Sequence, residues 1–437
     1  MPDEETTTLS AAPTVRTEPL EAPAPAGDAR VPAWTRWLVP LALVLAAVNL
    51  RPAITSLGSL MKEVTGGLHM SGGLAGVLTS VPAFCFALFG IMAPRLARRF
   101  GPGAVVFAGM AAITVGLLLR PFAGGTVTFL AASALALMGI AVSNVLMPVI
   151  VKRYFPDRVG SMTGLYSMAL AAGTSLAAVT TVPLTDALGG SWRQGLGVWA
   201  LLAVLAVAVW IPLTRDRSGS TTPAVRAQQE AAPALRITRS GTAWALACFF
   251  GLQATGAYIT MGWMPTIFRD AGVSAGTAGL LLSITMVMGV PLGFVIPWMV
   301  NRLRSQGPIV VALGACGLAG YAGLYLAPAS GAWAWALLLG ISNCAFPLAL
   351  TMIGKRSRTG AGVVRLSAFA QCVGYLLSIP GPLLVGLLHD RSGGWDLPIA
   401  LMAALMVPQI VVGVLAGRDR TIEDEAGVRE DEAGARR

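Results

Sequence analysis

The chain has 437 residues, of which 55% are hydrophobic and only 12% are charged, with a mean hydropathy of +0.70 and a formal net charge of +10. Soluble proteins carry about a quarter charged residues, so these proportions exclude an ordinary soluble fold. The positive charge alone fits a nucleic-acid-binding protein, but the positions of the basic residues argue against that class.

Long apolar stretches run through the chain from Trp37 onward. The preceding residues, 1–33, are rich in Pro, Ala, Thr and Glu, and this composition predicts a disordered cytosolic tail without a cleaved signal. Residues 37–60 supply the roughly 20 residues that cross a bilayer core. Together with later stretches they predict about twelve membrane-spanning helices. The later stretches lie near residues 72–94, 104–122, 127–151, 160–184, 194–213, 242–266, 276–299, 308–327, 332–353, 362–388 and 397–416.

Lys and Arg residues are divided unequally between the two sides of the predicted spans. The loops after the even-numbered spans hold most of them, whereas the loops after the odd-numbered spans hold only Lys62, Arg120, Arg193, Arg269 and Arg391. Because cytoplasmic loops carry the excess of positive charge, this asymmetry places both termini in the cytoplasm. We therefore expect a multi-pass protein of the inner (plasma) membrane, with the lipid bilayer rather than nucleic acid as its partner.

Groups that carry enzymatic chemistry are sparse. The five cysteines lie singly in apolar stretches, without the close pairs of metal sites and redox motifs. His69 and His389 fall at span ends, and no Asp or Glu falls deep within a predicted span. A membrane-embedded enzyme needs clustered acid, base or nucleophilic groups. We therefore predict no metal site, no cofactor and no enzymatic activity.

The two halves of the chain repeat the same features in the same order. The segment SGGLAGVLTS from Ser71 aligns without a gap on SAGTAGLLLS from Ser274, and the same register pairs Arg99 with Arg302. The alternative is a chance match of the small residues common in membrane helices. Repeats in a chain of twelve spans build a midplane site between two bundles that move against each other.

The repeat predicts an all-α membrane protein of twelve helices in two pseudo-symmetric six-helix bundles. The polar segment between the sixth and seventh spans is expected to link the bundles. The expected parts are a cytosolic tail (1–33), an N-terminal bundle (34–213), a cytosolic linker (214–240), a C-terminal bundle (241–417) and a second cytosolic tail (418–437).

The loop after the second predicted span resembles a motif of the major facilitator superfamily. PRLARRFG from Pro94 follows the pattern Gly-x-Leu-Ala-Asp-Arg-x-Gly, except that Pro94 replaces the first Gly and Arg98 replaces the Asp. The resemblance implies the twelve-helix transporter fold. It also implies a gating role for the loops that contain Arg98, Arg99 and Arg302.

Three other segments are more similar to one branch of that superfamily, the cyanate and nitroimidazole transporters. They are NLRPAITSLGSL from Asn49, FFGLQATGAYITMGWMP from Phe249 and GPLLVGLLHDRSGGW from Gly381. This resemblance implies a small planar anion or a polar heteroaromatic compound as the substrate.

Arg51 is the first candidate for substrate binding. It stands near the middle of the first predicted span, where an ionised side chain costs at least about 2.5 to 3.5 kcal/mol. Polar neighbours such as Asn49 and Thr55 indicate a hydrated face, and a guanidinium there can donate to two acceptors of a planar solute. The alternative is that Arg51 only bonds helix carbonyls or caps a neighbouring span. Pro52 lacks an N–H, so we expect a kink or hinge beside Arg51.

Gln253 occupies the corresponding depth in the seventh span, the repeat counterpart of the first. Its amide offers donors and acceptors, and Tyr258 and Trp263 offer flat apolar walls, so these three are further candidates for substrate binding. Alternatively, Trp263 belongs to an interfacial aromatic belt and Tyr258 is a packed core ring.

Polar residues of four other spans complete the predicted site. Asn144 and Asn343 lie on equivalent spans of the two halves, and Tyr166 and Gln371 lie on the fifth and eleventh spans, the latter with Tyr375. Each asparagine can equally bond a neighbouring helix, which is an ordinary use of Asn in bilayers.

These residues predict a secondary transporter that moves a small planar anion or polar heteroaromatic compound by alternating access. A broad-specificity drug exporter of the same fold is the main alternative, and a transporter-like membrane sensor is a third. We expect a monomer. The absence of deep carboxylates removes the usual proton relay, so import and export both stay open.

Overall fold

The computed structural model of the protein describes residues 35–215 and 237–425. The predicted tail at 1–33 and most of the predicted linker at 214–240 lie outside the described residues, as do residues 426–437. The described part contains twelve helical segments long and apolar enough to cross a membrane, so the predicted all-α fold is confirmed.

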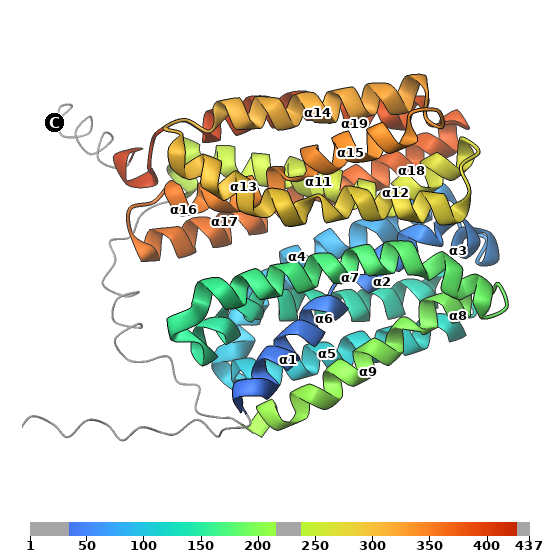
Figure 1. Ribbon diagram of the computed structural model, residues 1–437, viewed down its shortest axis with the longest axis horizontal. Coiled ribbons are helices and arrows are strands. Elements are labelled where there is room, and N and C mark those ends of the chain that lie inside the picture. Colours follow the sequence, from blue (N-terminus) through green and yellow to red (C-terminus); the bar gives the residue numbers. More distant parts are fainter. Residues whose placement is uncertain (1–34, 216–236, 426–437) are drawn as a thin grey trace, which may run out of the picture.

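The first six spans form the N-terminal bundle, coloured blue to green in Figure 1. Its main helices are α1 (Thr35–Asn49), α2 (Pro52–Ser59), α4 (Gly72–Phe100), α5 (Pro102–Leu119), α6 (Thr126–Tyr154), α7 (Val159–Ala187), α8 (Trp192–Gly197) and α9 (Trp199–Trp210). Shorter helices at the span ends are α3 (Met61–Gly67), η1 (Arg120–Phe122), η2 (Pro156–Arg158) and η3 (Ile211–Arg215). The first span is therefore two helices, α1 and α2, with a break between them.

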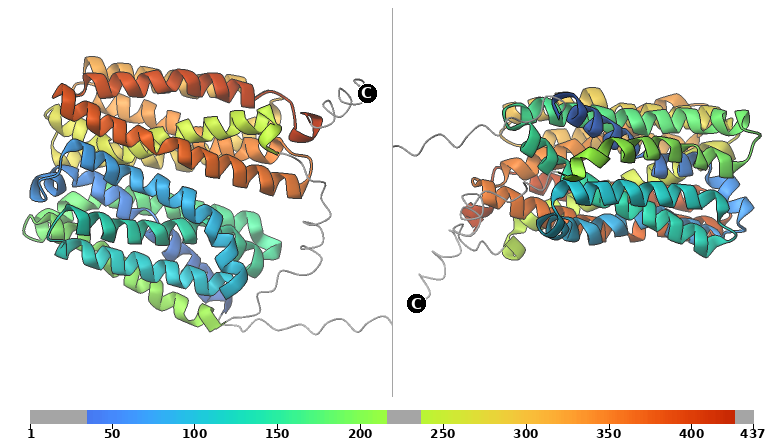
Figure 2. Two further views of the ribbon diagram at one scale, coloured as in Figure 1. Left: turned by 180° about the vertical axis from the view of Figure 1, so that it is seen from behind. Right: turned by 90° about the horizontal axis from the view of Figure 1, so that it is seen from below.

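The other six spans form the C-terminal bundle, coloured yellow to red in Figure 1. It begins with η4 (Ile237–Arg239) and α11 (Gly241–Asp270). The helices that follow are α12 (Ala275–Val287), α13 (Gly289–Arg302), α14 (Gly307–Leu326), α15 (Ala332–Asn343), α16 (Ala345–Lys355), α17 (Gly360–Ser378), α18 (Pro380–Ser392) and α19 (Asp396–Ala416). Figure 2 shows from behind that this bundle lies beside the N-terminal one.

Glycines allow the helices within each bundle to approach closely. A Cβ atom at Gly139 of α6 would lie 2.2 Å from the carbonyl oxygen of Gly109 on α5. Small residues at such crossings let membrane helices gain packing contacts where the hydrophobic effect gives no net attraction between them. The many glycines in the apolar stretches thus shape the helix contacts.

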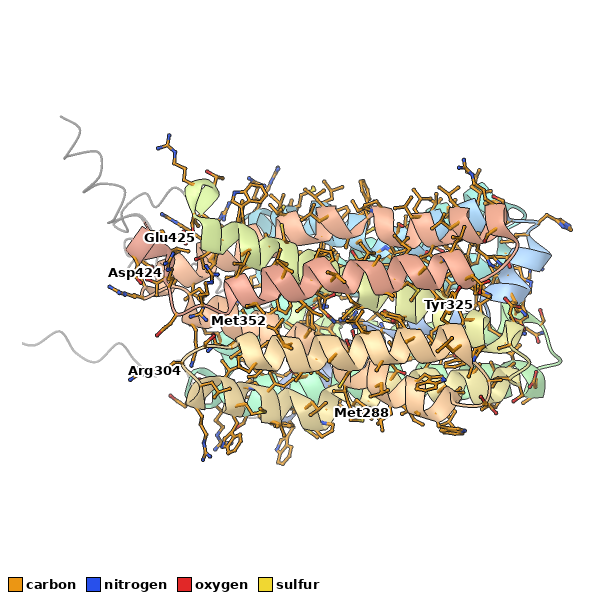
Figure 3. All side chains as sticks on the ribbon, turned by 90° about the horizontal axis from the view of Figure 1, so that it is seen from above. Met288, Arg304, Tyr325, Met352, Asp424 and Glu425 are labelled. Carbon is orange, nitrogen blue, oxygen red and sulfur yellow. The ribbon has the colours of Figure 1, made fainter. Side chains whose placement is uncertain are left out.

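The molecule has two distinct ends along its helices. The basic end carries the loops after the even-numbered spans, and Figure 3 shows Arg304, Asp424 and Glu425 gathered there. The opposite end carries the loops after the odd-numbered spans, including α3.

The two bundles pack tightly against each other toward the opposite end. There α12 packs along α7, and α18 packs along α4. A Cβ atom at Gly76 of α4 would lie 2.9 Å from the Cα atom of Leu383 on α18. A Cβ atom at Gly279 of α12 would lie 2.4 Å from the carbonyl oxygen of Ala178 on α7. Backbone meets backbone at these positions, which leaves no room for larger side chains.

Charged groups join the bundles at the same end. Asp390 of α18 accepts hydrogen bonds from the backbone N–H groups of Gly72 (2.8 Å) and Gly73 (2.9 Å) in the first turn of α4. A carboxylate at this place is stabilised by the positive end of the dipole of α4. Glu63 accepts two hydrogen bonds from Arg269, of 2.9 and 2.6 Å, and Lys62 pairs with Asp270. Each of these interactions joins one bundle to the other.

The bundles part toward the basic end. The helix α16 packs mainly against α11, α13 and α17 of its own bundle, and α1 packs mainly against α7 and α9. Figure 1 shows the ribbons of the two bundles diverging in this direction. The ribbons of the two bundles are thus close together at the opposite end and farther apart at the basic end (Figure 1), where α17 still packs against α4.

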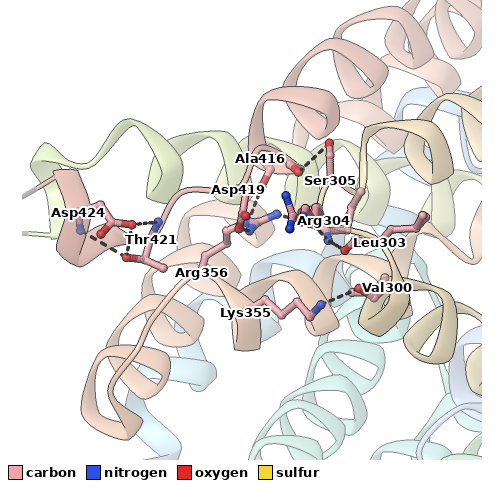
Figure 4. Close-up of polar contacts among 12 residues, drawn as sticks. Val300, Leu303, Arg304, Ser305, Lys355, Arg356, Ala416, Asp419, Thr421 and Asp424 are labelled. Carbon is pink, nitrogen blue, oxygen red and sulfur yellow. Dashed lines mark hydrogen bonds and ion pairs between the residues drawn. The ribbon is translucent and has the colours of Figure 1, made fainter.

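A cluster of polar contacts closes the basic end of the C-terminal bundle itself (Figure 4). The side chain of Arg356 is buried, and it donates to the carbonyl oxygen of Ala416 at 2.9 Å and to the side-chain oxygen of Gln306. Lys355 donates to the carbonyl oxygen of Val300 at 2.6 Å. These bonds join α13, α16 and α19 where their helices end.

Replacing Arg356 by Met should lower the free energy of unfolding by about 2 to 3 kcal/mol, because two buried acceptors lose their donor. Thermal unfolding of the purified protein in detergent measures this change. Arg358→Met is the matched control, since the Arg358 side chain is 67% exposed and pairs with Asp424 at the surface. Equal losses of stability in the two variants would contradict the role given to Arg356.

Glu425 ties the segment after α19 to the start of α11. Its carboxylate accepts hydrogen bonds of 2.6 Å from the hydroxyl groups of both Ser240 and Thr242. Burial raises the pKa of this carboxyl, but the hydrogen bonds outweigh burial and leave the pKa below its usual value. Glu425 therefore holds this contact as an anion at neutral pH.

Candidate functional site

Arg51 lies in the break of the first span, between the end of α1 at Asn49 and the start of α2 at Pro52. Proline cannot donate a backbone hydrogen bond, and it occupies the first helical position of α2, where none is needed. The expected kink beside Arg51 is therefore an interruption of the helix. It places the arginine, partly exposed, near the middle of a span.

The charge of Arg51 lies within electrostatic range of three tyrosines from three different helices. The positive charge interacts electrostatically with Tyr166 of α7, Tyr258 of α11 and Tyr375 of α17. Tyr166 belongs to the N-terminal bundle, and the other two belong to the C-terminal bundle. Arg51 thus faces the space between the bundles rather than lipid.

Tyr375 is the centre of an aromatic cluster beside Arg51. Its ring stacks on Phe86 of α4, with centroids 5.0 Å apart, and meets the edge of Phe250 at 5.1 Å. The ring of Tyr258 lies 6.5 Å away. The cluster presents flat apolar surfaces from both bundles next to one fixed cation.

The guanidinium of Arg51 has no hydrogen-bond acceptor among the described residues. The described spans hold Asp and Glu only at their ends, so no deep carboxylate neutralises the charge. Charged groups within membranes ordinarily pair or face a water-filled cavity. An unpaired guanidinium within an aromatic cluster is suited to bind an anion, because its fork can donate two parallel hydrogen bonds.

Gln253 lies within a network inside the C-terminal bundle. Its amide nitrogen donates to the backbone and side-chain oxygens of Asn343, both at 2.9 Å. Its amide oxygen accepts from Gln409 at 3.0 Å. Because protein groups occupy both ends of the amide, this placement favours helix packing over substrate contact for Gln253 and Asn343.

The remaining candidates are placed differently from one another. Asn144 accepts a 2.9 Å hydrogen bond from the hydroxyl group of Tyr166, and so orients one of the tyrosines near Arg51. Gln371 donates to Ser367 of its own helix. Trp263 is buried beside Trp395, with ring centroids 5.7 Å apart, and is not an exposed belt residue.

Comparison with known proteins decides the family. The family model described as Major Facilitator Superfamily matches residues 41–379. The chain belongs to this superfamily. It is accordingly an integral multi-pass membrane protein with a transporter fold.

Three similar curated proteins support the branch expected from the sequence. The chain is 35% identical to the uncharacterized transporter YycB of Bacillus subtilis (strain 168), over 88% of this chain and 94% of the relative. It is 32% identical to the 2-nitroimidazole transporter of Escherichia coli (strain K12), over 87% and 95%. It is 28% identical to the cyanate transport protein CynX of the same organism, over 85% and 95%.

A solved structure confirms the fold. A bacterial homolog of the human lysosomal transporter Spinster, in an inward-facing and occupied conformation, superposes with a TM-score of 0.70 at 15% identity. The match covers 87% of this chain and 95% of that one.

The predicted gating arginines of this transporter do not join the bundles in the described conformation. Arg98, Arg99 and Arg302 are exposed at the basic end. Arg99 lies over the ring of Phe100 and Arg302 over the ring of Trp298, each within its own bundle. Their gating role stays a prediction, and it concerns a state in which the basic end is closed.

Several buried residues of the transporter were not predicted from the sequence. Phe86 and Phe250 are ordinary apolar residues in the sequence, and only the packing of Tyr375 reveals them. Arg120 was expected in a loop, but its side chain is fully buried. The signal that could have found it is its position within the apolar stretch 104–122, ahead of Pro121.

Proposed function

We propose that this chain is a secondary transporter that carries a small planar anion, or a polar heteroaromatic compound able to act as one, by alternating access. The observation that carries the proposal is Arg51. It is a cation near the middle of a broken span, without an acceptor among the described residues, and it lies within electrostatic range of tyrosines of both bundles.

The shape of the site supports a planar solute. A guanidinium is flat and donates two parallel hydrogen bonds to two acceptor atoms in its plane. The rings of Phe86, Phe250 and Tyr375 offer apolar faces to a flat solute held in that plane. Two of the similar transporters are named for cyanate, which is a small linear anion, and for 2-nitroimidazole, which is a flat heteroaromatic compound.

The described conformation fits one state of an alternating-access cycle if the basic end is the cytoplasmic end. The excess of basic loops favours that orientation. We infer that the described conformation is then the inward-facing one, held together on the outer side by the contacts of Gly76, Gly279 and Asp390. Rocking the bundles about the central site would break these contacts and bring Arg98 and Arg302 toward the other bundle.

The described spans contain no deep carboxylate, which is the usual proton relay of a transporter. This restricts the sources of energy that can drive transport. Arginine does not release its proton in proteins, so Arg51 cannot serve as the proton relay. Moving a monovalent anion inward against an interior-negative potential costs about 2.3 kcal/mol per 100 mV. We propose that net uptake requires exchange, metabolic consumption of the substrate or a proton carried by the substrate, whereas export can follow the potential.

A flux assay in proteoliposomes tests the proposal. Labelled cyanate, benzoate and 2-nitroimidazole should each be tried, and at least one should accumulate with saturable kinetics that the small anions inhibit. If only lipophilic cationic drugs are transported and none of the small planar compounds competes, the chain is instead a broad drug exporter.

A further inference from the structure

Arg120 lies in η1, where the third span ends, at the end of the molecule opposite to the basic end. Its side chain is fully buried. Its Nε donates to the hydroxyl group of Ser133 at 3.0 Å, and its Nη1 donates to the carbonyl oxygen of Ala53 at 2.8 Å. The guanidinium carbon lies 5.7 Å from the ring centroid of Phe129. All of these partners are formally neutral.

The second terminal nitrogen of Arg120, Nη2, is buried without any hydrogen-bond partner among the described residues. The carboxylates of Glu63 and Asp270 at this end of the molecule are already bound to Arg269 and Lys62. A buried charge without a counter-ion is costly, and proteins normally pair it. Arg120 thus keeps the two N–H donors of Nη2 and one full charge available for a ligand.

Arg120 lines a small cavity between the two bundles. The walls come from α2, α4 and α6 on one side and from Tyr258 and Gly262 of α11 on the other. About 10 Å³ is open to the centre of a water molecule, which is room for one water. In the described conformation the cavity is therefore too small for a planar organic anion.

The cavity lies next to the Arg51 site, on its side toward the opposite end of the molecule. Its wall on the first span begins at Ala53, two residues after Arg51. Tyr258 belongs to both places, because it lines the cavity and interacts with the charge of Arg51. Gly58 of this wall would place a Cβ atom 1.9 Å from the carbonyl oxygen of Met261 on α11, so the bundles touch here. Parting the opposite end must widen this cavity.

We propose that Arg120 is a second binding position for the transported anion, on the outer side of Tyr258, available in the outward-open state and collapsed in the described one. The proposal rests on the proposed function. An anion entering from outside meets the free Nη2 of Arg120 first and then passes Tyr258 to reach Arg51. Closure of the opposite end removes the space beside Arg120, which drives the anion toward Arg51.

A purely structural role is the competing explanation, since Arg120 also joins α2 to α6 through Ala53 and Ser133. The two explanations differ in how they depend on conformation. A structural link affects both states of the transporter, whereas the proposed position contributes to anion binding only in the outward-open state.

The experiment measures binding of labelled cyanate to the full chain held in each state. Gly76→Val favours the outward-open state, because the added side chain collides with Leu383 where the bundles meet. A cross-linked pair, Gly73→Cys with Leu387→Cys, holds the opposite end closed, since a Cβ atom at Gly73 lies 3.0 Å from the Leu387 side chain. Both are made after replacing the five native cysteines.

Arg120→Gln should weaken cyanate binding about tenfold or more in the outward-open form and less than twofold in the cross-linked form. Arg391→Gln is the matched control, because Arg391 is an exposed arginine at the same end of the molecule, and it should leave both affinities unchanged. Equal weakening in both states by Arg120→Gln, or no weakening in either, would overturn the proposal.

Two further results keep the test decisive. If Arg120→Gln does not fold, Arg120→Lys is measured in the same way, because an ammonium keeps the charge but lacks the planar fork that bonds Ala53 through one terminal nitrogen and leaves the other free. An effect confined to the outward-open form supports the proposal, and an equal effect in both forms rejects it. If the unaltered transporter binds cyanate in neither state, the proposed function fails for cyanate, and the role of Arg120 fails with it.

Discussion

Replacing Arg51 by Gln is expected to weaken binding of a planar anion by tenfold to about 150-fold and to abolish its transport at low concentration. A hydrogen bond to a charged group contributes about 1.5 to 3 kcal/mol, and 1.4 kcal/mol corresponds to a factor of ten in affinity. Gln is close to Arg in its first carbons but carries no charge, so the variant removes the cation and keeps most of the packing.

The effect should depend on charge rather than on the loss of an arginine as such. Arg304→Gln is the matched control, because Arg304 is exposed at the basic end, and its transport kinetics should match those of the unaltered protein. Arg51→Lys should fall between the two, since an ammonium keeps the charge without the planar fork. Binding is measured by equilibrium titration and transport by uptake into proteoliposomes.

Thermal stability separates binding from folding in this experiment. An uncompensated cation in a span is costly, so Arg51→Gln should leave the melting temperature unchanged or raise it. It should lose the stabilisation that a bound anion gives to the unaltered protein. If Arg51→Gln binds and transports the anion normally, the arginine has only a structural role and the drug-exporter alternative becomes the better one.

The twelve spans could be predicted from the sequence because each has its own apolar length, which does not depend on any partner. Arg51 could be predicted for the same reason, since a charge in the middle of an apolar stretch is visible without knowledge of the neighbouring helices. The tyrosines near it were partly predicted, as polar groups of the fifth, seventh and eleventh spans.

The contacts between helices could not be predicted. Gln253 has the right depth for a substrate ligand, yet Asn343 and Gln409 from two other helices occupy its amide. Arg120 has the sequence position of a loop residue, yet it is buried because the carbonyl oxygen of Ala53 lies within its reach. In both cases the deciding partner is distant in the sequence and carries no charge.

Gly76→Val is expected to abolish transport while leaving anion binding largely intact. The Cβ atom would lie 2.9 Å from both the Cα atom and the carbonyl oxygen of Leu383, and backbone atoms cannot move aside as a side chain can. Overpacking of this kind costs about 1 to 3 kcal/mol. That cost applies only when the opposite end is closed, so it lowers the population of the inward-open state about fivefold to 150-fold.

Gly90→Val is the matched control on the same helix. A Cβ atom at Gly90 would meet nothing within 4 Å, so the substitution adds the same side chain to α4 without touching the other bundle. Transport by this variant should stay within about twofold of the unaltered protein. A comparable loss in both variants would mean that α4 tolerates no valine in general, rather than that the bundles must meet at Gly76.

Labelling of a cysteine at Ser367 shows which state each variant occupies. Ser367 is partly exposed on α17, in the half of the eleventh span toward the basic end. In a chain without the native cysteines, Ser367→Cys should react with a polar thiol reagent from the basic end, and Gly76→Val should slow that reaction. Slower labelling together with retained anion binding would show that closure at Gly76 governs access from the cytoplasm. Unchanged labelling would place the loss of transport in another step of the cycle.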